Sequence, residues 1–142
     1  MNPEASLYAR IGGQSTIDRI AHGFYASMRT MPEAAAVHAM HRMGLDQAEA
    51  RLRAFLSGFL GGPDLYRSRY GEPMMRRRHL PFPIGPAERD AWLACMARSL
   101  DEALEHPALR QEVFASIAQF ADHMRNRDGR APSMPRTGPT PS

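Results

Sequence analysis

Apolar residues recur at helical spacing along almost all of the 142-residue chain, and no run of alternating β-branched residues interrupts them. Apolar positions that repeat at every third or fourth residue mark the face of a helix that turns toward a protein core. The sequence therefore predicts an all-α fold. A chain of this length is expected to form one domain with a single core.

Proline and glycine divide the helical pattern into segments. Helices are expected to begin at Pro32, Pro86 and Pro107, because proline is well accommodated in the first turn of a helix. Residues Met74–His79 are expected to form at most two helical turns, since the prolines that follow disfavour helical geometry. Residues Asp64–Pro73 are expected to form a loop.

Polar residues suggest where the remaining helices begin. The first helix is expected over Pro3–Ile11 with Asn2 as its cap, and the second is expected to start at Ser15, whose hydroxyl would cap it. A further helix is expected after Gly44, with Asp46 and Glu49 resembling a capping box. Residues 1–127 are therefore expected to form the globular domain. Residues 128–142 are rich in Pro, Gly, Ser and Thr, and are expected to be a disordered tail.

The single cysteine, Cys95, cannot form an internal disulfide or hold a zinc or iron–sulfur site by itself. A reducing compartment is consistent with this. The N-terminal residues lack the pattern of a signal peptide, and no stretch has the roughly 20 apolar residues needed to span a bilayer. A cytoplasmic protein without a membrane partner is expected.

All eighteen basic residues are arginine, and they stand against fifteen acidic residues, for a formal net charge of +3. The sequence pI near 9.6 is compatible with nucleic-acid binding, but acids and bases are interspersed and the excess is small. The run Arg76-Arg77-Arg78 is the most concentrated basic segment. This run has three interpretations: it binds nucleic acid in a small helical module, it contacts the carboxylates of a cofactor, or it forms an ordinary solvated face.

The histidines show no pair at the i, i+4 spacing of a two-histidine metal face, which argues against a zinc hydrolase. His79 stands between the arginine run and a proline-rich segment that fixes the backbone direction, and both an axial metal ligand and a surface histidine fit this position. Tyr25 and Trp92 lie on inward stripes, where core packing is the simpler interpretation. Each also carries a polar hydrogen that a buried site must satisfy.

A succession of segments resembles the group II truncated hemoglobins in order and spacing. The segments are Phe24-Tyr25, Arg51–Leu56, Leu60–Pro63, Arg78–Phe82 and Glu88–Leu93. The resemblance extends from Leu7-Tyr8 to about Asn126. The combination of the histidine segment with Glu-Arg-Asp-x-Trp is its most specific part.

This resemblance implies a two-over-two helical sandwich around a b-type heme, with His79 as the proximal iron ligand. The opposite face of the iron would be open to O2, CO or NO. Tyr25 and Trp92 would donate hydrogen bonds to bound O2 and slow its release. His41 would lie at the mouth of the distal site, Ala48 at the position of a distal gate, and Leu52 over the heme.

The resemblance also implies a cofactor-binding set on the remaining walls. Arg51 and Arg78 are candidates to pair with the heme propionates, because guanidinium groups suit carboxylates. Phe55 would line the pocket, and Tyr66 and Phe82 complete the set.

The function that follows from the resemblance is reversible binding of O2 and other diatomic ligands. A heme peroxidase or an NO dioxygenase is the alternative, and either would need an external electron donor or reductase, since the chain shows no nucleotide-binding motif. A small nucleic-acid-binding module that uses Arg76–Arg78 is the alternative from another class. With a heme protein as the expected function, no nucleic-acid partner is expected, and the protein would be a monomer or a homodimer.

Overall fold

The computed structural model describes residues 5–41, 44–80 and 82–126. The helices in these ranges are α1 (Leu7–Arg10), α2 (Gln14–Thr30), a 3-10 turn η1 (Pro32–Ala34), α3 (Ala35–Ala39), α4 (Leu45–Phe59), α5 (Leu65–Tyr70), α6 (Met75–His79), α7 (Pro86–Ala103) and α8 (Pro107–His123). No strand occurs among these residues. The predicted all-α class is confirmed, while the predicted tail at 128–142 lies outside the described residues.

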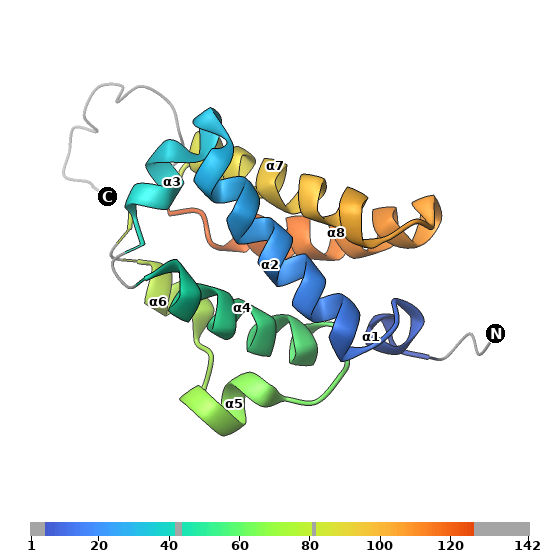
Figure 1. Cartoon of the computed structure of the whole chain (residues 1–142). Coiled ribbons are helices and arrows are strands. Elements are labelled where there is room, and N and C mark those ends of the chain that lie inside the picture. Colours follow the sequence, from blue (N-terminus) through green and yellow to red (C-terminus); the bar gives the residue numbers. More distant parts are fainter. Residues whose placement is uncertain (1–4, 42–43, 81, 127–142) are drawn as a thin grey trace, which may run out of the picture.

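The long helices form two layers. Helix α2 lies across α4 and α7, and α7 packs against α8 (Figure 1). The short helix α5 packs against α4 at one side of the molecule. This arrangement is the expected two-over-two sandwich. Among the described residues, none of the helices has the length and apolar character that a membrane-spanning segment requires.

Three proline-initiated segments begin where the sequence predicts. Pro32, Pro86 and Pro107 each occupy the first turn of their element. At the start of α7, a Glu88 side-chain oxygen also accepts a 2.8 Å hydrogen bond from the Gly85 amide. The predicted short helix at Met74–His79 is present as α6.

Two other predictions on helix starts were wrong, and the start of α4 was correct apart from its predicted capping box. Helix α1 begins at Leu7 with the Ser6 side chain as its cap, so it is shorter than Pro3–Ile11, and the predicted cap Asn2 lies outside the described residues. Helix α2 begins at Gln14, and no side chain caps it, so Ser15 is inside the helix. Helix α4 begins after Gly44 without a capping box. Its Asp46 faces Arg29, and its Glu49 side chain bonds Arg53 further along the same helix.

The loop predicted for Asp64–Pro73 was also wrong, because α5 occupies most of it. The Asp64 side chain accepts a hydrogen bond from the Arg67 amide, which caps the helix. The buried Tyr66 anchors α5 toward α4. Packing of this kind stabilises a six-residue helix that would be marginal alone.

The core is centred on the crossing of α2 and α7. Gly23 permits the two helices to approach closely, since an added Cβ would lie 2.8 Å from the Ser99 hydroxyl oxygen. That hydroxyl donates a 2.6 Å hydrogen bond to the Ile20 carbonyl, so a buried polar group is satisfied at the contact. The fully buried side chains include Phe24, Ile17, Met28, Leu56, Met96, Leu100 and Ile117.

Candidate functional site

A cavity of about 460 Å³ lies beside this core, with α2, α4, α6, α7 and α8 contributing to its walls. Every residue that the sequence analysis assigns to the site lines it: Tyr25, His41, Ala48, Arg51, Leu52, Phe55, Tyr66, Arg78, His79, Phe82 and Trp92. These residues come from segments that are far apart in the sequence. The fold therefore brings the predicted site together around one space, while the individual roles stay predictions.

His79 is the last residue of α6 and is partly buried at the cavity wall. Its Nδ1 lies 2.7 Å from the Met75 carbonyl oxygen, which can only accept a hydrogen bond. Nδ1 is therefore the protonated nitrogen of the neutral ring. The lone pair is then on Nε2, which is the atom available to a metal.

Asn126 anchors the segment that follows His79. Its side-chain nitrogen donates hydrogen bonds to the carbonyls of His79 (3.2 Å) and Phe82 (2.8 Å). Its side-chain oxygen accepts a 2.9 Å bond from the Ile84 amide, and its own amide donates to the Ile84 carbonyl at 2.8 Å. The chain after α8 thus holds the backbone after His79 in place.

Tyr25 and Trp92 approach the cavity from α2 and α7, and both pack against Phe24. The ring centroids of Phe24 and Tyr25 are 4.8 Å apart with an edge-on contact, and those of Phe24 and Trp92 are also 4.8 Å apart. Phe24 is fully buried, so it fixes both neighbours. Within the described part of the chain, neither the Tyr25 hydroxyl nor the Trp92 indole donates a hydrogen bond to a protein group. Both donors are therefore available to a ligand in the cavity.

The Tyr25 hydroxyl stays protonated at neutral pH. Burial raises the pKa of Tyr25 well above its usual value of 10, and the charge of Glu49 acts in the same direction. A protonated phenol retains the hydrogen that it would donate to a ligand.

His41 faces Tyr25 at the cavity, with an edge-on ring contact at 5.6 Å. Burial lowers the pKa of His41 below its usual 6.5 and outweighs the hydrogen bond to Val37, which acts in the opposite direction. Nδ1 lies 3.0 Å from the Val37 carbonyl oxygen, so Nδ1 carries the proton of the neutral ring. The other nitrogen, Nε2, is therefore the hydrogen-bond acceptor of the ring.

The lowered pKa of His41 predicts a loss of stability in acid. The unfolded chain protonates this histidine as the pH falls through about 6.5, whereas the folded protein binds the proton only at lower pH. The free energy of unfolding therefore decreases as the pH falls below about 6.5. We expect the melting temperature to fall less between pH 7.5 and 5.5 in His41→Phe than in the wild type. Equal falls in both proteins would contradict this assignment.

Arg51 and Arg78 line the cavity, and the guanidinium group of each lies near a tyrosine ring. The Arg51 guanidinium carbon lies 4.3 Å from the Tyr70 ring centroid, and the Tyr70 and Tyr66 rings are 5.0 Å apart. The Arg78 guanidinium lies 5.8 Å from the Tyr66 ring, and it donates hydrogen bonds to the Pro73 and Glu72 carbonyls. These contacts hold two cations that have no acidic partner among the described residues.

The remaining walls are mostly apolar. Phe55 packs against Phe120 with ring centroids 4.9 Å apart, which joins α4 to α8 across the cavity wall. Leu52 lies one turn before Phe55, and the buried Ala48 lies one further turn back on α4. The methyl side chain of Ala48 donates no hydrogen bond into the cavity.

The structure adds lining residues that the sequence analysis did not assign to the site: Val37, Met40, Met75, Ile84, Glu88, Arg89, Phe120, Ala121 and Met124. Apolar residues at helical spacing indicate the buried face of a helix, but not whether that face meets a neighbouring helix or a cavity. Phe24 and Asn126 support the site through side-chain contacts. Phe24 belongs to the Phe24-Tyr25 segment of the family resemblance, but neither residue was assigned a role in the site.

The chemistry of these walls fits a heme. An apolar slot suits the porphyrin ring, a neutral histidine with Nε2 available suits the iron, and two cations at the rim suit the propionates. No cluster of three or more His, Cys, Asp or Glu residues suited to a metal ion occurs in the described ranges. A single protein ligand to the iron is consistent with this.

Comparisons with known proteins agree with the site. The model of the family described as bacterial-like globin matches residues 6–126. The group 2 truncated hemoglobin YjbI of Bacillus subtilis (strain 168) is 32% identical over 115 residues, which are 81% of this chain and 85% of that protein.

Two solved structures extend the comparison. The group II 2-on-2 hemoglobin from the plant pathogen Agrobacterium tumefaciens is 44% identical with a TM-score of 0.82, covering 88% of this chain and 97% of that one. The cold-adapted truncated hemoglobin from the Antarctic marine bacterium Pseudoalteromonas haloplanktis TAC125 is 40% identical with a TM-score of 0.82, covering 87% and 99%. The similarity thus includes every helix that borders the cavity.

Proposed function

Because this chain belongs to the bacterial-like globin family of heme-binding proteins, and within it to the group II truncated hemoglobins, we propose that it binds heme b through His79 and takes up O2 reversibly. The observation that carries this proposal is the hydrogen bond from His79 to the Met75 carbonyl. It fixes the tautomer whose Nε2 binds iron, at the wall of a cavity of suitable character. Ferrous heme supplies one open coordination position for a diatomic ligand such as O2, CO or NO.

Tyr25 and Trp92 are proposed to stabilise the ligand. Each brings a donor to the cavity without a partner among the described protein groups, and the raised pKa of Tyr25 keeps its hydroxyl protonated. Phe24 restricts both rings, so little ordering is required when a ligand arrives. Neutral His41 is proposed to accept a hydrogen bond on this side through Nε2.

Arg51 and Arg78 are proposed to bind the propionates. Their guanidinium groups lie along the Tyr70–Tyr66 edge of the cavity and have no carboxylate partner among the described residues. A propionate contact would therefore not have to displace an existing ion pair. Phe55, Tyr66 and Phe82 are proposed to contact the porphyrin from the same cavity wall.

The partner of His79 favours reversible binding over peroxide cleavage. A carboxylate partner would draw the Nδ1 proton and give the ring anionic character, which pushes electron density toward the iron and favours O–O cleavage. His79 instead donates to a backbone carbonyl, and this leaves it a neutral ligand. Peroxidase or NO dioxygenase activity is thus the secondary candidate.

The absorption spectrum tests the proposal. We expect the purified protein reconstituted with hemin to show a strong Soret band, which shifts on reduction and shifts again when CO is added. O2 should bind to the ferrous form and be released again when the gas is removed. A protein that takes up no hemin, or that only oxidises when it meets O2, would contradict the proposal.

A further inference from the structure

Residues 64–80 carry a local excess of positive charge. They contain five arginines and two acidic residues, an excess of three positive charges. Residues 125–142 carry an equal excess, with four arginines and one aspartate, and the remaining residues together have three more acidic than basic side chains. The charged residues of the segment 64–80 are Asp64, Arg67, Arg69, Glu72, Arg76, Arg77 and Arg78.

Both acidic residues of the segment face the same arginine. Arg67 lies 3.1 Å from a carboxylate oxygen of Asp64 and 3.0 Å from one of Glu72. Arg69 and Arg77 are exposed, and within the ranges that the structure describes neither forms an ion pair. Their charges are directed to solvent. We call the exposed surface of Arg69 and Arg77 on α5 and α6 the basic face.

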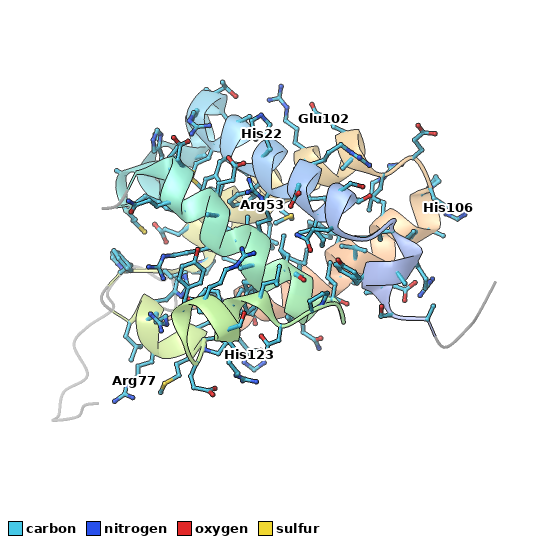
Figure 2. The ribbon with its side chains drawn as sticks, turned by 60° about the horizontal axis from the view of Figure 1, so that its bottom comes forward. His22, Arg53, Arg77, Glu102, His106 and His123 are labelled. Carbon is cyan, nitrogen blue, oxygen red and sulfur yellow. The ribbon has the colours of Figure 1, made fainter. Side chains whose placement is uncertain are left out.

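The other charged concavity of the protein is different. It lies between α2, α4 and α7, where Arg53 pairs with Asp18 (3.3 Å) and Glu49 (2.6 Å), and where His22 Nδ1 is 3.4 Å from Glu49. Its cations are thus offset by neighbouring acids. Figure 2 shows His22 and Glu102 of this concavity at the opposite edge of the molecule from Arg77.

The basic face adjoins the cofactor cavity. Helix α6 carries Arg77 and Arg78 and ends at His79, and both Arg78 and His79 line the cavity. Tyr70, the neighbour of Arg69, joins the ring contacts along the cavity rim. A protein that binds here would therefore lie against the edge at which the heme is proposed to meet solvent.

We propose that the basic face is the docking surface for an acidic one-electron donor protein that reduces the ferric heme. This inference rests on the proposed function. One electron passes from a reduced flavin or iron–sulfur centre of the donor to the ferric iron, which becomes ferrous, while the donor is oxidised by one electron. No covalent bond is formed or broken in the transfer.

Electrostatic complementarity suits such a partner. Opposite charges accelerate the encounter of two proteins and fix their orientation, and electron-transfer partners form small, weak interfaces that separate after each reaction. Arg51 and Arg78 would be offset by the propionates, whereas Arg69 and Arg77 remain to face the partner.

The test measures reduction of the ferric holoprotein by reduced plant-type [2Fe–2S] ferredoxin, a small acidic iron–sulfur protein, with CO present to trap the ferrous form. We expect a second-order rate constant that falls as salt is added, and that falls about tenfold in Arg77→Glu and in Arg69→Glu. Arg98→Glu is the matched control, because it makes the same charge change on α7, where Arg98 faces Glu102. Its rate constant should stay near that of the wild type.

A second readout locates the contact. Oxidised ferredoxin added to the isotope-labelled ferrous CO form should broaden or shift amide signals of residues 64–80, and Arg77→Glu should abolish the effect. Equal rate constants in Arg77→Glu and Arg98→Glu, or perturbation of another face, would overturn the docking proposal. So would tight binding of a DNA duplex with no binding of ferredoxin. A protein without a CO-induced Soret shift would reject the heme function as well, which separates the two failures.

Discussion

Replacing His79 with glycine is expected to abolish the normal iron coordination and to weaken heme binding by about tenfold or more. Removing only the hydrogen-bond partner of a metal ligand already lowers metal affinity by about tenfold, and here the ligand itself is removed. The hydrogen bond between Nδ1 and the Met75 carbonyl supports this expectation, since it leaves Nε2 as the nitrogen that binds the iron. Hemin titration followed at the Soret band measures the affinity. Added imidazole should then restore the wild-type spectrum by occupying the space left by the side chain.

His106→Ala is the matched control for His79. His106 is exposed at the start of α8 and does not line the cavity. Figure 2 shows it at the opposite side of the molecule from Arg77 of α6. Replacement of His106 should leave hemin affinity and spectrum unchanged. A His79→Gly protein that binds hemin as tightly as the wild type, with an unaltered spectrum, would exclude His79 as the iron ligand.

Removing one distal donor is expected to speed the release of O2. A hydrogen bond to a strongly polarised group contributes about 1.5–3 kcal/mol, so Trp92→Phe and Tyr25→Phe should each raise the O2 dissociation rate by roughly ten- to one-hundredfold. CO is less polarised when bound, and its dissociation rate should change much less. Stopped-flow displacement of each gas measures both rates.

Tyr8→Phe provides the control for Tyr25→Phe. The Tyr8 hydroxyl bonds the Gln14 side chain at 3.1 Å and lies outside the cavity lining. Its removal should leave O2 dissociation unchanged. Unaltered O2 dissociation in Trp92→Phe would exclude the indole as a donor to the ligand, and the same outcome in Tyr25→Phe would exclude the phenol.

The parts of the fold that the sequence predicts are those with a local cause. Pro86 and Pro107 mark the starts of α7 and α8, because amides in the first turn have no hydrogen-bond partner within the helix, so the N–H that proline lacks is not needed there. Helix α5 was missed although the Asp64 side chain caps it, because six residues are too few for a helix to be stable by itself. Its stability depends on the packing of Tyr66 toward α4, where Tyr66 meets the ring of Phe55, and a short window of sequence around Asp64 does not contain Phe55.

The capping box proposed for α4 shows the opposite kind of error. Asp46 and Glu49 have the spacing of a capping box, but the residue that precedes the helix is Gly44. Glycine has no side chain that could accept a hydrogen bond from the backbone of the first turn. Glu49 instead bonds Arg53 one turn further along α4, and it also lies 3.4 Å from His22 of α2. The local pattern therefore misassigned a residue whose partners lie later in its own helix and on a neighbouring helix.

The candidate site was predicted more completely than the helix boundaries. Its residues are named by a resemblance to a family, and the fold brings all of them to one cavity. What the sequence does not reveal is how they are held. Phe24 contacts Tyr25 and Trp92, and Asn126 bonds a segment that lies more than forty residues earlier in the chain.

The completely buried side chains of the core and the side chains that line the cavity are two separate sets of residues. Phe24 joins the two sets, because its fully buried ring contacts both Tyr25 and Trp92. A substitution at Tyr25 or Trp92 therefore changes a core contact as well as the cavity wall, and its cost in stability counts against the threshold that selection maintains. Over evolutionary time, this coupling means that changes at the cavity wall and changes in the core are selected together.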